Sequence, residues 1–288
     1  MKLMPLPESL AIDDRKIFAQ PRLQTAMLDL DHLATLIHNG EEQTIRQEWL
    51  HRREEEKLQT LHYTKRHLEW LGGRICAKEA SLQYLHANNL VSWGQNSILS
   101  PRTLSSATLR APLLQIMSSA SGRPFLDPNV LPEVLSMPHI SISHSRGYAL
   151  AVAASTPCGI DIQAESKALV RVKDRFCSRT EEELLGNRLK QLQQSARLTL
   201  LWVAKEAVKK GTLSERMPGF LDLTLTHIES IPETEGHIQC LFTLDSQESN
   251  KQSVSPPLQF LVTVCLHQGY GIGLCVIPAQ PCTGVDNA

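Results

Sequence analysis

A chain of 288 residues is long enough to bury one large core or two smaller ones, and 42% hydrophobic with 20% charged residues is typical of a globular protein. The formal net charge of −1 argues against a protein that coats nucleic acid, because binding to a phosphate backbone depends on an excess of cationic side chains. A local cationic pocket for one phosphorylated ligand is still compatible with this charge.

The seven cysteines are scattered, odd in number and without a C-x-x-C pair. This pattern disfavours a disulfide framework or a zinc site, and it indicates buried, reduced thiols in a protein of the cytoplasm. Residues 1–18 carry charges and prolines without the apolar core of a secretory signal. No apolar stretch approaches the length of a membrane span, so we expect no contact with a membrane.

The first half of the chain is predicted to be mainly helical. Residues 1–40 mix short apolar pieces with prolines and are expected to form an extension. Helical patterning follows over about residues 41–87, where the mixed charges at 52–57 indicate a solvated helix face. Residues 94–132 are rich in serine, proline and glycine, and they predict irregular structure with short strands.

Strand patterns begin near residue 140. Residues 140–143 alternate apolar and polar, so that both serines share one face, and residues 160–163 alternate in the same way. Between them, residues 148–154 form a continuous apolar run, as expected of a strand buried on both faces.

The last third combines one helix with further strands. The helix is predicted from 195 to 210, where Gly211 is a suitable residue to end it. Strands are predicted at 237–244 and 258–266 around a polar loop. A last strand at 270–277 is followed by a tail that we expect to be frayed over 278–288.

Two short repeats indicate a duplicated α+β unit. The tetrapeptide Ala-Lys-Glu-Ala at 77–80 recurs at 204–207, and the Gly-Tyr pair that opens a strand at 147–148 recurs at 269–270. The two offsets, 127 and 122 residues, are nearly equal, although coincidence between common residues is the alternative.

We therefore predict an α+β fold of two similar lobes related by pseudo-two-fold duplication, each with a small, mostly antiparallel sheet and a long helix. The N-terminal lobe would span residues 1–155 and the C-terminal lobe residues 156–288. A ligand cleft is expected at their junction.

One side of the predicted helix 195–210 carries a stripe of charge. At about 100° per residue, Lys205, Glu206 and Lys209 lie within one arc together with Trp202. The same pattern fits a solvated face on which Glu206 pairs with Lys209 or Lys210. The stripe alone therefore does not identify a site.

The strand at 160–163 places Asp161 and Gln163 on one face. Mg²⁺ takes hard oxygen ligands, typically one or two carboxylates with water and phosphate oxygens, and Asp161 with Glu206 would meet this description. A turn-capping role or an ion pair with Lys205 explains Asp161 equally well.

The pair Ser143-His144 lies at the end of a predicted strand. Neighbours on a strand face opposite ways, so His144 cannot activate Ser143 as a nucleophile, and contacts with phosphate oxygens are the better interpretation. Several cations could join them, or form the solvated side of a helix: Lys65, Arg66, Arg74, Lys78 and Arg123.

Together these elements resemble the 4′-phosphopantetheinyl transferase superfamily, in its longer, pseudo-dimeric, surfactin-type branch. The family's G-[IV]-D-[IVL]-E strand looks like residues 159–163, and its W-x-x-K-E-[AS]-x-x-K helix looks like residues 202–209. Residues 141–145 resemble its Ser-His-Ser element, residues 122–124 its Gly-Lys/Arg-Pro element, and residues 65–78 its cationic helix. Five elements in the family's order make the resemblance specific.

The resemblance implies a transferase of the holo-[acyl-carrier-protein] synthase type. Its substrates would be coenzyme A and an apo acyl or peptidyl carrier protein, with transfer of 4′-phosphopantetheine to a serine and release of adenosine 3′,5′-bisphosphate. By this resemblance Asp161, Gln163 and Glu206 hold Mg²⁺, Glu206 helps to deprotonate the serine, and Lys209 neutralises the diphosphate. The remaining coenzyme A contacts would be Arg66, Arg74, Lys78, Arg123, Ser143, His144 and Lys205.

Gln163 departs from the glutamate that the family often has at this position. An amide brings no charge, so we expect metal binding to need more Mg²⁺ and to depend more on coenzyme A. Gln163 is also the one sequence feature that favours a catalytically weak regulatory module that binds coenzyme A or a carrier. A third possibility is an unrelated two-lobed protein, and two lobes in one chain predict a monomer.

Overall fold

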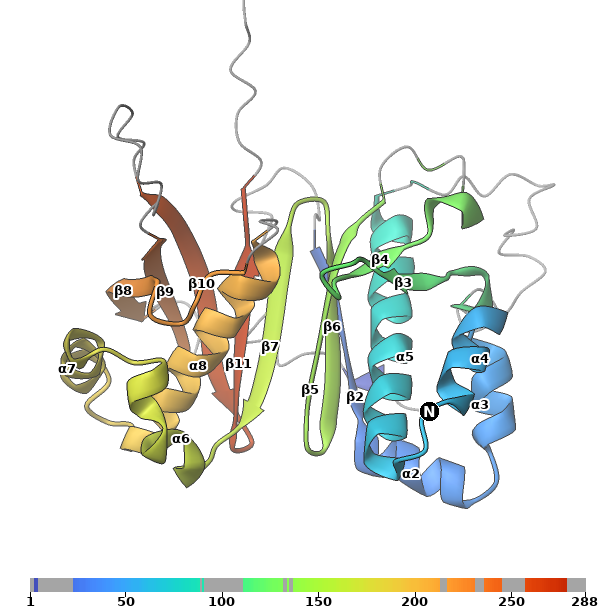
Figure 1. Cartoon of the computed structure of the whole chain (residues 1–288), viewed down its shortest axis with the longest axis horizontal. Helices are drawn as coiled ribbons and strands as arrows, with labels where there is room; N and C mark the ends of the chain where they lie inside the picture. Colours follow the sequence, from blue (N-terminus) through green and yellow to red (C-terminus); the bar gives the residue numbers. More distant parts are fainter. Residues whose placement is uncertain are drawn as a thin grey trace, which may run out of the picture.

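The computed structural model describes residues 3–4, 23–88, 90, 111–131, 134, 137–212, 217–230, 236–244 and 257–278. Most of the predicted polar loop and frayed tail lies outside these residues. Figure 1 shows two lobes side by side, each made of a sheet and a long helix, which confirms the predicted α+β fold.

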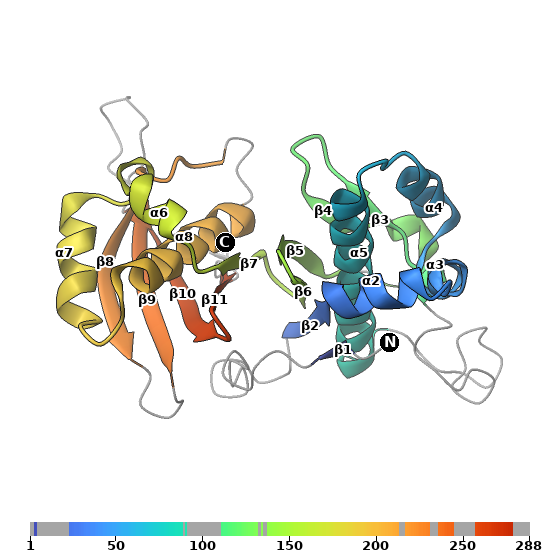
Figure 2. The same cartoon turned by 90° about the horizontal axis from the view of Figure 1, so that it is seen from below.

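The N-terminal lobe is built on a four-stranded antiparallel sheet in the order β1-β2-β6-β5. The strands are β1 (Leu3–Met4), β2 (Leu23–Asp29), β5 (His139–Ser145) and β6 (Tyr148–Ala154). Helix α5 (Thr64–Ala87) packs on the sheet, and three shorter helices pack against α5, as Figure 2 shows: α2 (Leu30–His38), α3 (Glu42–Trp49) and α4 (Arg52–Gln59). A small hairpin of β3 (Ile116–Ser118) and β4 (Pro124–Leu126) lies beside β5.

The structure differs from the prediction at residues 23–38, which form β2 and α2 rather than an extension. Strand β2 lies inside the sheet, where its central residues Ala26, Met27 and Leu28 are almost completely buried. The apolar and polar residues of β2 do not alternate clearly, because the strand is buried on both of its faces. Its sequence therefore gives little sign of a strand.

The C-terminal lobe is built on a five-stranded antiparallel sheet in the order β7-β11-β10-β9-β8. The strands are β7 (Cys158–Ala164), β8 (Leu223–Ser230), β9 (His237–Leu244), β10 (Leu258–His267) and β11 (Tyr270–Val276). Helix α8 (Gln194–Gly211) packs on this sheet, with α6 (Lys167–Arg171) and α7 (Arg179–Arg188) beside it. The predicted strands and long helix of this lobe agree with these bounds, whereas β8, α6 and α7 were not predicted.

Helix α8 lies unusually close to the sheet because glycines face it. A Cβ on Gly159 would lie 1.9 Å from the Ala207 carbonyl oxygen and 2.6 Å from the Gly211 backbone nitrogen. A Cβ on Gly273 would similarly lie 2.7 Å from the Val203 carbonyl oxygen. Gly211 is the last residue of α8 rather than a cap beyond it. Only glycine allows this approach, which sets the position of α8 over β7.

The two lobes meet where β5 runs alongside β7 (Figure 1). Serine hydroxyls join the strands: Ser141, Ser143 and Ser145 accept hydrogen bonds from the backbone nitrogens of the β7 residues 160, 162 and 164, at 3.0–3.3 Å. An apolar layer between the two sheets supports this joint, and its buried members include Met27, Leu150, Val152, Ile160, Ile162, Ile272 and Leu274.

A buried ion pair occurs at the same place in each lobe and supports the predicted duplication. Lys78 of α5 pairs with Glu54, and Lys205 of α8 pairs with Glu181. Lys205 lies 127 positions after Lys78, and Glu181 lies 127 positions after Glu54. Each glutamate also belongs to a capping box at the start of a shorter helix. Each lysine further donates to a backbone carbonyl 29 residues earlier in the chain. Two unrelated folds would not share all of these contacts.

No helix in the described part of the chain is both long and apolar enough to cross a membrane.

Candidate active site

Asp161 lies at the joint between the lobes, on the face of β7 that looks toward α8. Its side chain is almost fully buried, and its Oδ1 atom accepts two hydrogen bonds of 2.7 Å, from Ser143 Oγ and from Lys210 Nζ. The carboxylate therefore contacts a strand of one lobe and the helix of the other. Both contacts end on Oδ1, so Oδ2 can take a further ligand.

Lys210 is the lysine that reaches Asp161, although it was not among the predicted site residues. Its Nζ atom also lies 3.1 Å from the carbonyl oxygen of Ile160 on β7 and 3.4 Å from that of Ile142 on β5. The spacing of the helix motif in the sequence does point to Lys210. Counted from Trp202, the last lysine of a W-x-x-K-E-A-x-x-K helix falls at position 210 and not at 209.

Glu206 lies one helical turn before Lys210, so both side chains project from the same side of α8. Glu206 Oε1 accepts a hydrogen bond of 3.1 Å from Lys209 Nζ. Lys209 Nζ in turn lies 3.8 Å from the centroid of the Phe220 ring. The structure thus gives the site two carboxylates and two ammonium groups, each carboxylate with its own lysine.

Gln163 lies two residues after Asp161 on the same face of β7, as predicted, and its amide donates to the Ala164 carbonyl oxygen at 3.1 Å. This hydrogen bond uses the amide nitrogen, so the amide oxygen can face a cation. No group of three or more His, Cys, Asp or Glu residues in the described ranges could hold a metal ion. A magnesium site would therefore depend on two carboxylates, those of Asp161 and Glu206, and on this amide oxygen.

The predicted phosphate contact of Ser143 is not what its hydroxyl does in the structure. Ser143 is buried, donates to Asp161 and accepts from the Ile162 backbone nitrogen. A hydroxyl has one proton to donate, so its donor capacity is used within the protein. Ser143 orients Asp161 and holds the lobes together.

His144 projects from the opposite face of β5, as predicted, and its side chain is 45% exposed. Its Nδ1 atom lies 3.6 Å from Glu69 Oε1 on α5, and Lys65 lies 3.7 Å from the same oxygen. Burial lowers the pKa of His144 below its ordinary value, against the opposing effect of Glu69. A mostly neutral imidazole at pH 7 can still bind a phosphate oxygen through a ring N–H.

A cleft of about 1040 Å³ opens between the lobes. It is lined by the β3–β4 hairpin and its turn, by the start of β5, and by the end of α8, including Lys210. Arg123 lines the cleft from the hairpin side, and burial lowers its pKa from the ordinary value. The predicted Gly-Arg-Pro element and Lys210 therefore face the same space.

The predicted cations of α5 are not among the residues that line this cleft. Lys78 is fully buried, donates to the Trp49 carbonyl oxygen at 2.7 Å and pairs with Glu54. Arg74 lies 3.7 Å from Glu54 and 4.7 Å above the Trp70 ring. Burial lowers the pKa of both cations, that of Lys78 to about 8. Lys78 serves the interior of its lobe, and its assignment to coenzyme A does not fit the structure.

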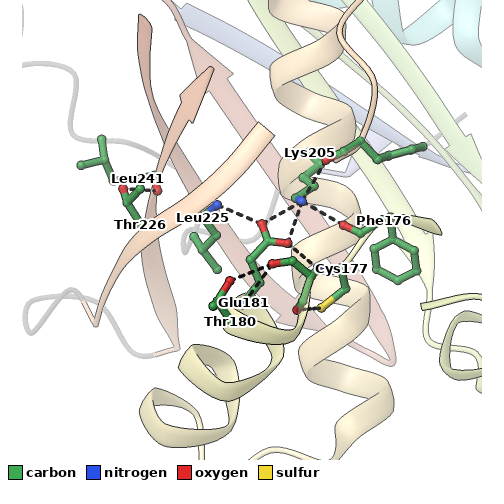
Figure 3. A network of polar contacts seen from close by, with 10 residues as sticks. Phe176, Cys177, Thr180, Glu181, Lys205, Leu225, Thr226 and Leu241 are labelled. Atoms are coloured by element: carbon green, nitrogen blue, oxygen red, sulfur yellow. Dashed lines mark hydrogen bonds and ion pairs between the residues drawn. The ribbon is translucent and has the colours of Figure 1, made fainter. Parts of the chain in front are cut away.

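Lys205 does not reach the cleft either. Its side chain is fully buried, and Figure 3 shows its Nζ atom beside Glu181 and the backbone carbonyl group of Phe176, whose oxygen lies at 2.8 Å. The carbonyl oxygen of Phe220 accepts from the same Nζ atom at 2.9 Å. Glu181 also accepts from the Leu225 backbone nitrogen at 2.9 Å. With every donor direction occupied, the Lys205 ammonium cannot bind a phosphate or pair with Asp161. Arg66, by contrast, is exposed near the start of α5.

Residues 157–274 match the model of the 4′-phosphopantetheinyl transferase superfamily. The matched segment begins just before β7 and ends within β11, so it contains Asp161, Gln163, Glu206, Lys209 and Lys210. No curated protein matches the chain.

Proposed function

We propose that this protein transfers the 4′-phosphopantetheine group of coenzyme A to a serine hydroxyl of an apo acyl or peptidyl carrier protein and releases adenosine 3′,5′-bisphosphate. The observation that carries the proposal is Lys210, which lines the interlobe cleft and binds the buried Asp161 carboxylate at 2.7 Å. The match of the C-terminal lobe to the 4′-phosphopantetheinyl transferase superfamily supports it. The surfactin-type, two-lobed architecture is part of the proposal.

Each residue of the site has a separate role in the proposed reaction. Lys210 lies between Asp161 and the cleft, so it is suited to stabilise negative charge on the diphosphate as the phosphorus–oxygen bond breaks. Glu206, with 23% of its side chain exposed, can accept the proton of the carrier serine. Arg123 and His144 are candidates for the remaining phosphate oxygens, with exposed Arg66 as a further one.

Mg²⁺ fits the donor set because all of the available donors are hard oxygens. Asp161 through Oδ2, Glu206 and the Gln163 amide would hold it. When bound, Mg²⁺ supplies Lewis-acid stabilisation of phosphate charge. The site has one negative charge fewer than a site of three carboxylates, and two lysines lie beside its carboxylates. We therefore expect its affinity for Mg²⁺ to be low unless coenzyme A adds negative charge.

The test is covalent labelling of an apo carrier protein with fluorescent coenzyme A and Mg²⁺. Glu206→Ala should abolish labelling, because it removes both an oxygen ligand and the proton acceptor. The matched control is Glu79→Ala: Glu79 occupies the equivalent position of the first long helix, where Gln83 and not a lysine contacts it at 2.8 Å. Glu79→Ala should keep the wild-type labelling rate.

Two other outcomes have a defined meaning. Tight binding of coenzyme A or carrier without labelling by the wild type would favour the regulatory module, to which the uncharged Gln163 points. Absence of both binding and labelling would refute the proposal and leave the charged cluster with a structural role.

A further inference from the structure

Lys209 is held between a carboxylate and an aromatic ring. Its ammonium nitrogen donates to Glu206 Oε1 at 3.1 Å and lies 3.8 Å from the centroid of Phe220. Only 16% of its side chain is exposed. A cation between a carboxylate and the face of an aromatic ring is attracted by both, and it loses its freedom to follow a substrate.

Phe220 is itself fixed by the buried Lys205 ammonium, whose other contacts Figure 3 shows. Its carbonyl oxygen accepts from the buried Lys205 ammonium at 2.9 Å, and the same ammonium binds the carbonyl oxygen of Phe176. Its ring stacks on Trp202 at a centroid distance of 4.6 Å, and Trp202 packs edge-on against Phe176 at 5.1 Å. The ring therefore has a defined position in the segment after α8.

The duplicated lobe provides an internal comparison. The N-terminal lobe keeps the buried lysine–glutamate pair and a glutamate, Glu79, at the position equivalent to Glu206. At the position equivalent to Lys209 it has Leu82, which is buried. At this helix position, therefore, the C-terminal lobe has an ammonium over a ring and the N-terminal lobe has a buried leucine.

We propose that Lys209 is a positioning residue that fixes the orientation of the Glu206 carboxylate, and that Phe220 acts on Glu206 only through Lys209. This inference rests on the proposed function for its kinetic consequences. It differs from the role that the resemblance implied for Lys209, which was direct contact with the diphosphate. Lys210 takes that contact instead.

The kinetic test uses Lys209→Met, which keeps chain length and packing on Phe220 but removes the charge. The loss of a hydrogen bond between charged groups should lower kcat for carrier labelling on the order of 10- to 100-fold. KM for coenzyme A should change by less than about threefold, because the substrate loses no contact. Lys209→Arg should recover most of kcat. The control Lys173→Met removes a lysine that pairs with Glu182 at 2.6 Å elsewhere in the same lobe, and it should leave kcat unchanged.

A double-mutant cycle tests the route through Lys209. Phe220→Leu should lower kcat in the same direction, and in the Lys209→Met background it should have almost no further effect. An equal effect of Phe220→Leu in both backgrounds would overturn the proposal. So would a Lys209→Met variant whose main change is a raised KM for coenzyme A, since that result would mean that Lys209 touches the substrate.

A measurement that needs no activity separates this inference from the proposed function. In protein labelled with ¹³C at the lysine ε-carbon, the signal of Lys209, assigned with Lys209→Arg, should be shifted upfield by the Phe220 ring. The signal should return to the usual lysine position in Phe220→Leu. A wild-type protein that shows the shift but labels no carrier would refute the function and keep the lysine placement. Absence of the shift would refute the placement whatever the activity.

Discussion

Substitution of Lys205 by methionine distinguishes a structural lysine from a substrate-binding one. The side chain is fully buried, and its ammonium binds Glu181 and the carbonyl oxygens of Phe176 and Phe220. Removing one partner of a buried ion pair costs about 3–5 kcal/mol, because the other charge stays buried without compensation. Glu181 keeps a backbone donor at Leu225, which offsets part of the loss, so we expect about 3 kcal/mol or more of lost unfolding free energy.

Urea unfolding at pH 7 measures this loss, with the exposed Lys190→Met as control. Lys205→Met combined with Glu181→Gln should recover part of the stability, because a neutral amide costs less to bury than an unpaired carboxylate. Coenzyme A binding by the folded variant, measured by calorimetry at low temperature, should be close to that of the wild type. A Lys205→Met variant that keeps its stability and loses coenzyme A affinity would show that the buried placement is wrong.

Three further predictions concern packing, the metal site and alkaline pH. Gly159→Ala should lower the free energy of unfolding by about 3 kcal/mol or more and abolish carrier labelling, because its Cβ would meet backbone atoms of α8. The control is Gly186→Ala, whose Cβ would have its nearest contact at 3.7 Å. It should be neutral or slightly stabilising in the same unfolding assay. Gln163→Glu should lower the Mg²⁺ concentration that gives half-maximal labelling, and an unchanged Mg²⁺ dependence would contradict a role for residue 163 in metal binding. Burial raises the pKa of Cys240 to about 12 from its ordinary 9.0, so above pH 9 the unfolded chain holds fewer protons than the native one and the unfolding free energy falls as pH rises. Cys240→Ala should make this fall shallower by up to about 1.4 kcal/mol per pH unit, and an unchanged slope between pH 9 and 11 would show that this thiol ionises in the folded protein.

The sequence alone determined the elements that have a strong period of their own. Alternation over 160–163 correctly placed Asp161 and Gln163 on one face of β7, and the two matched repeats predicted the duplication that the buried lysine–glutamate pairs support. The helix 195–210 was predicted to within one residue at each end. These predictions succeed because periodicity is a property of one segment and its two faces.

The sequence could not predict which side chains approach one another across elements. Lys78 and Lys205 have the same helical setting as the other cations, but both point into their lobes, where glutamates of shorter helices meet them. The sequence made Ser143 a plausible phosphate ligand, but in the structure its hydroxyl is hydrogen-bonded to Asp161 and to the Ile162 backbone nitrogen of β7.

Tertiary structure also decided which lysine serves Asp161. On a helical wheel Lys209 and Lys210 are both close to Glu206, and either could neutralise a carboxylate. Gly159 brings α8 onto β7 at one particular rotation, in which Lys210 reaches Asp161 and Lys209 turns toward Phe220. The sequence therefore determined which residue types the site contains. The close contact of Gly159 on β7 with α8 determined which side chains of the site pair with one another, because the rotation of a helix is set by its packing and not by the helix itself.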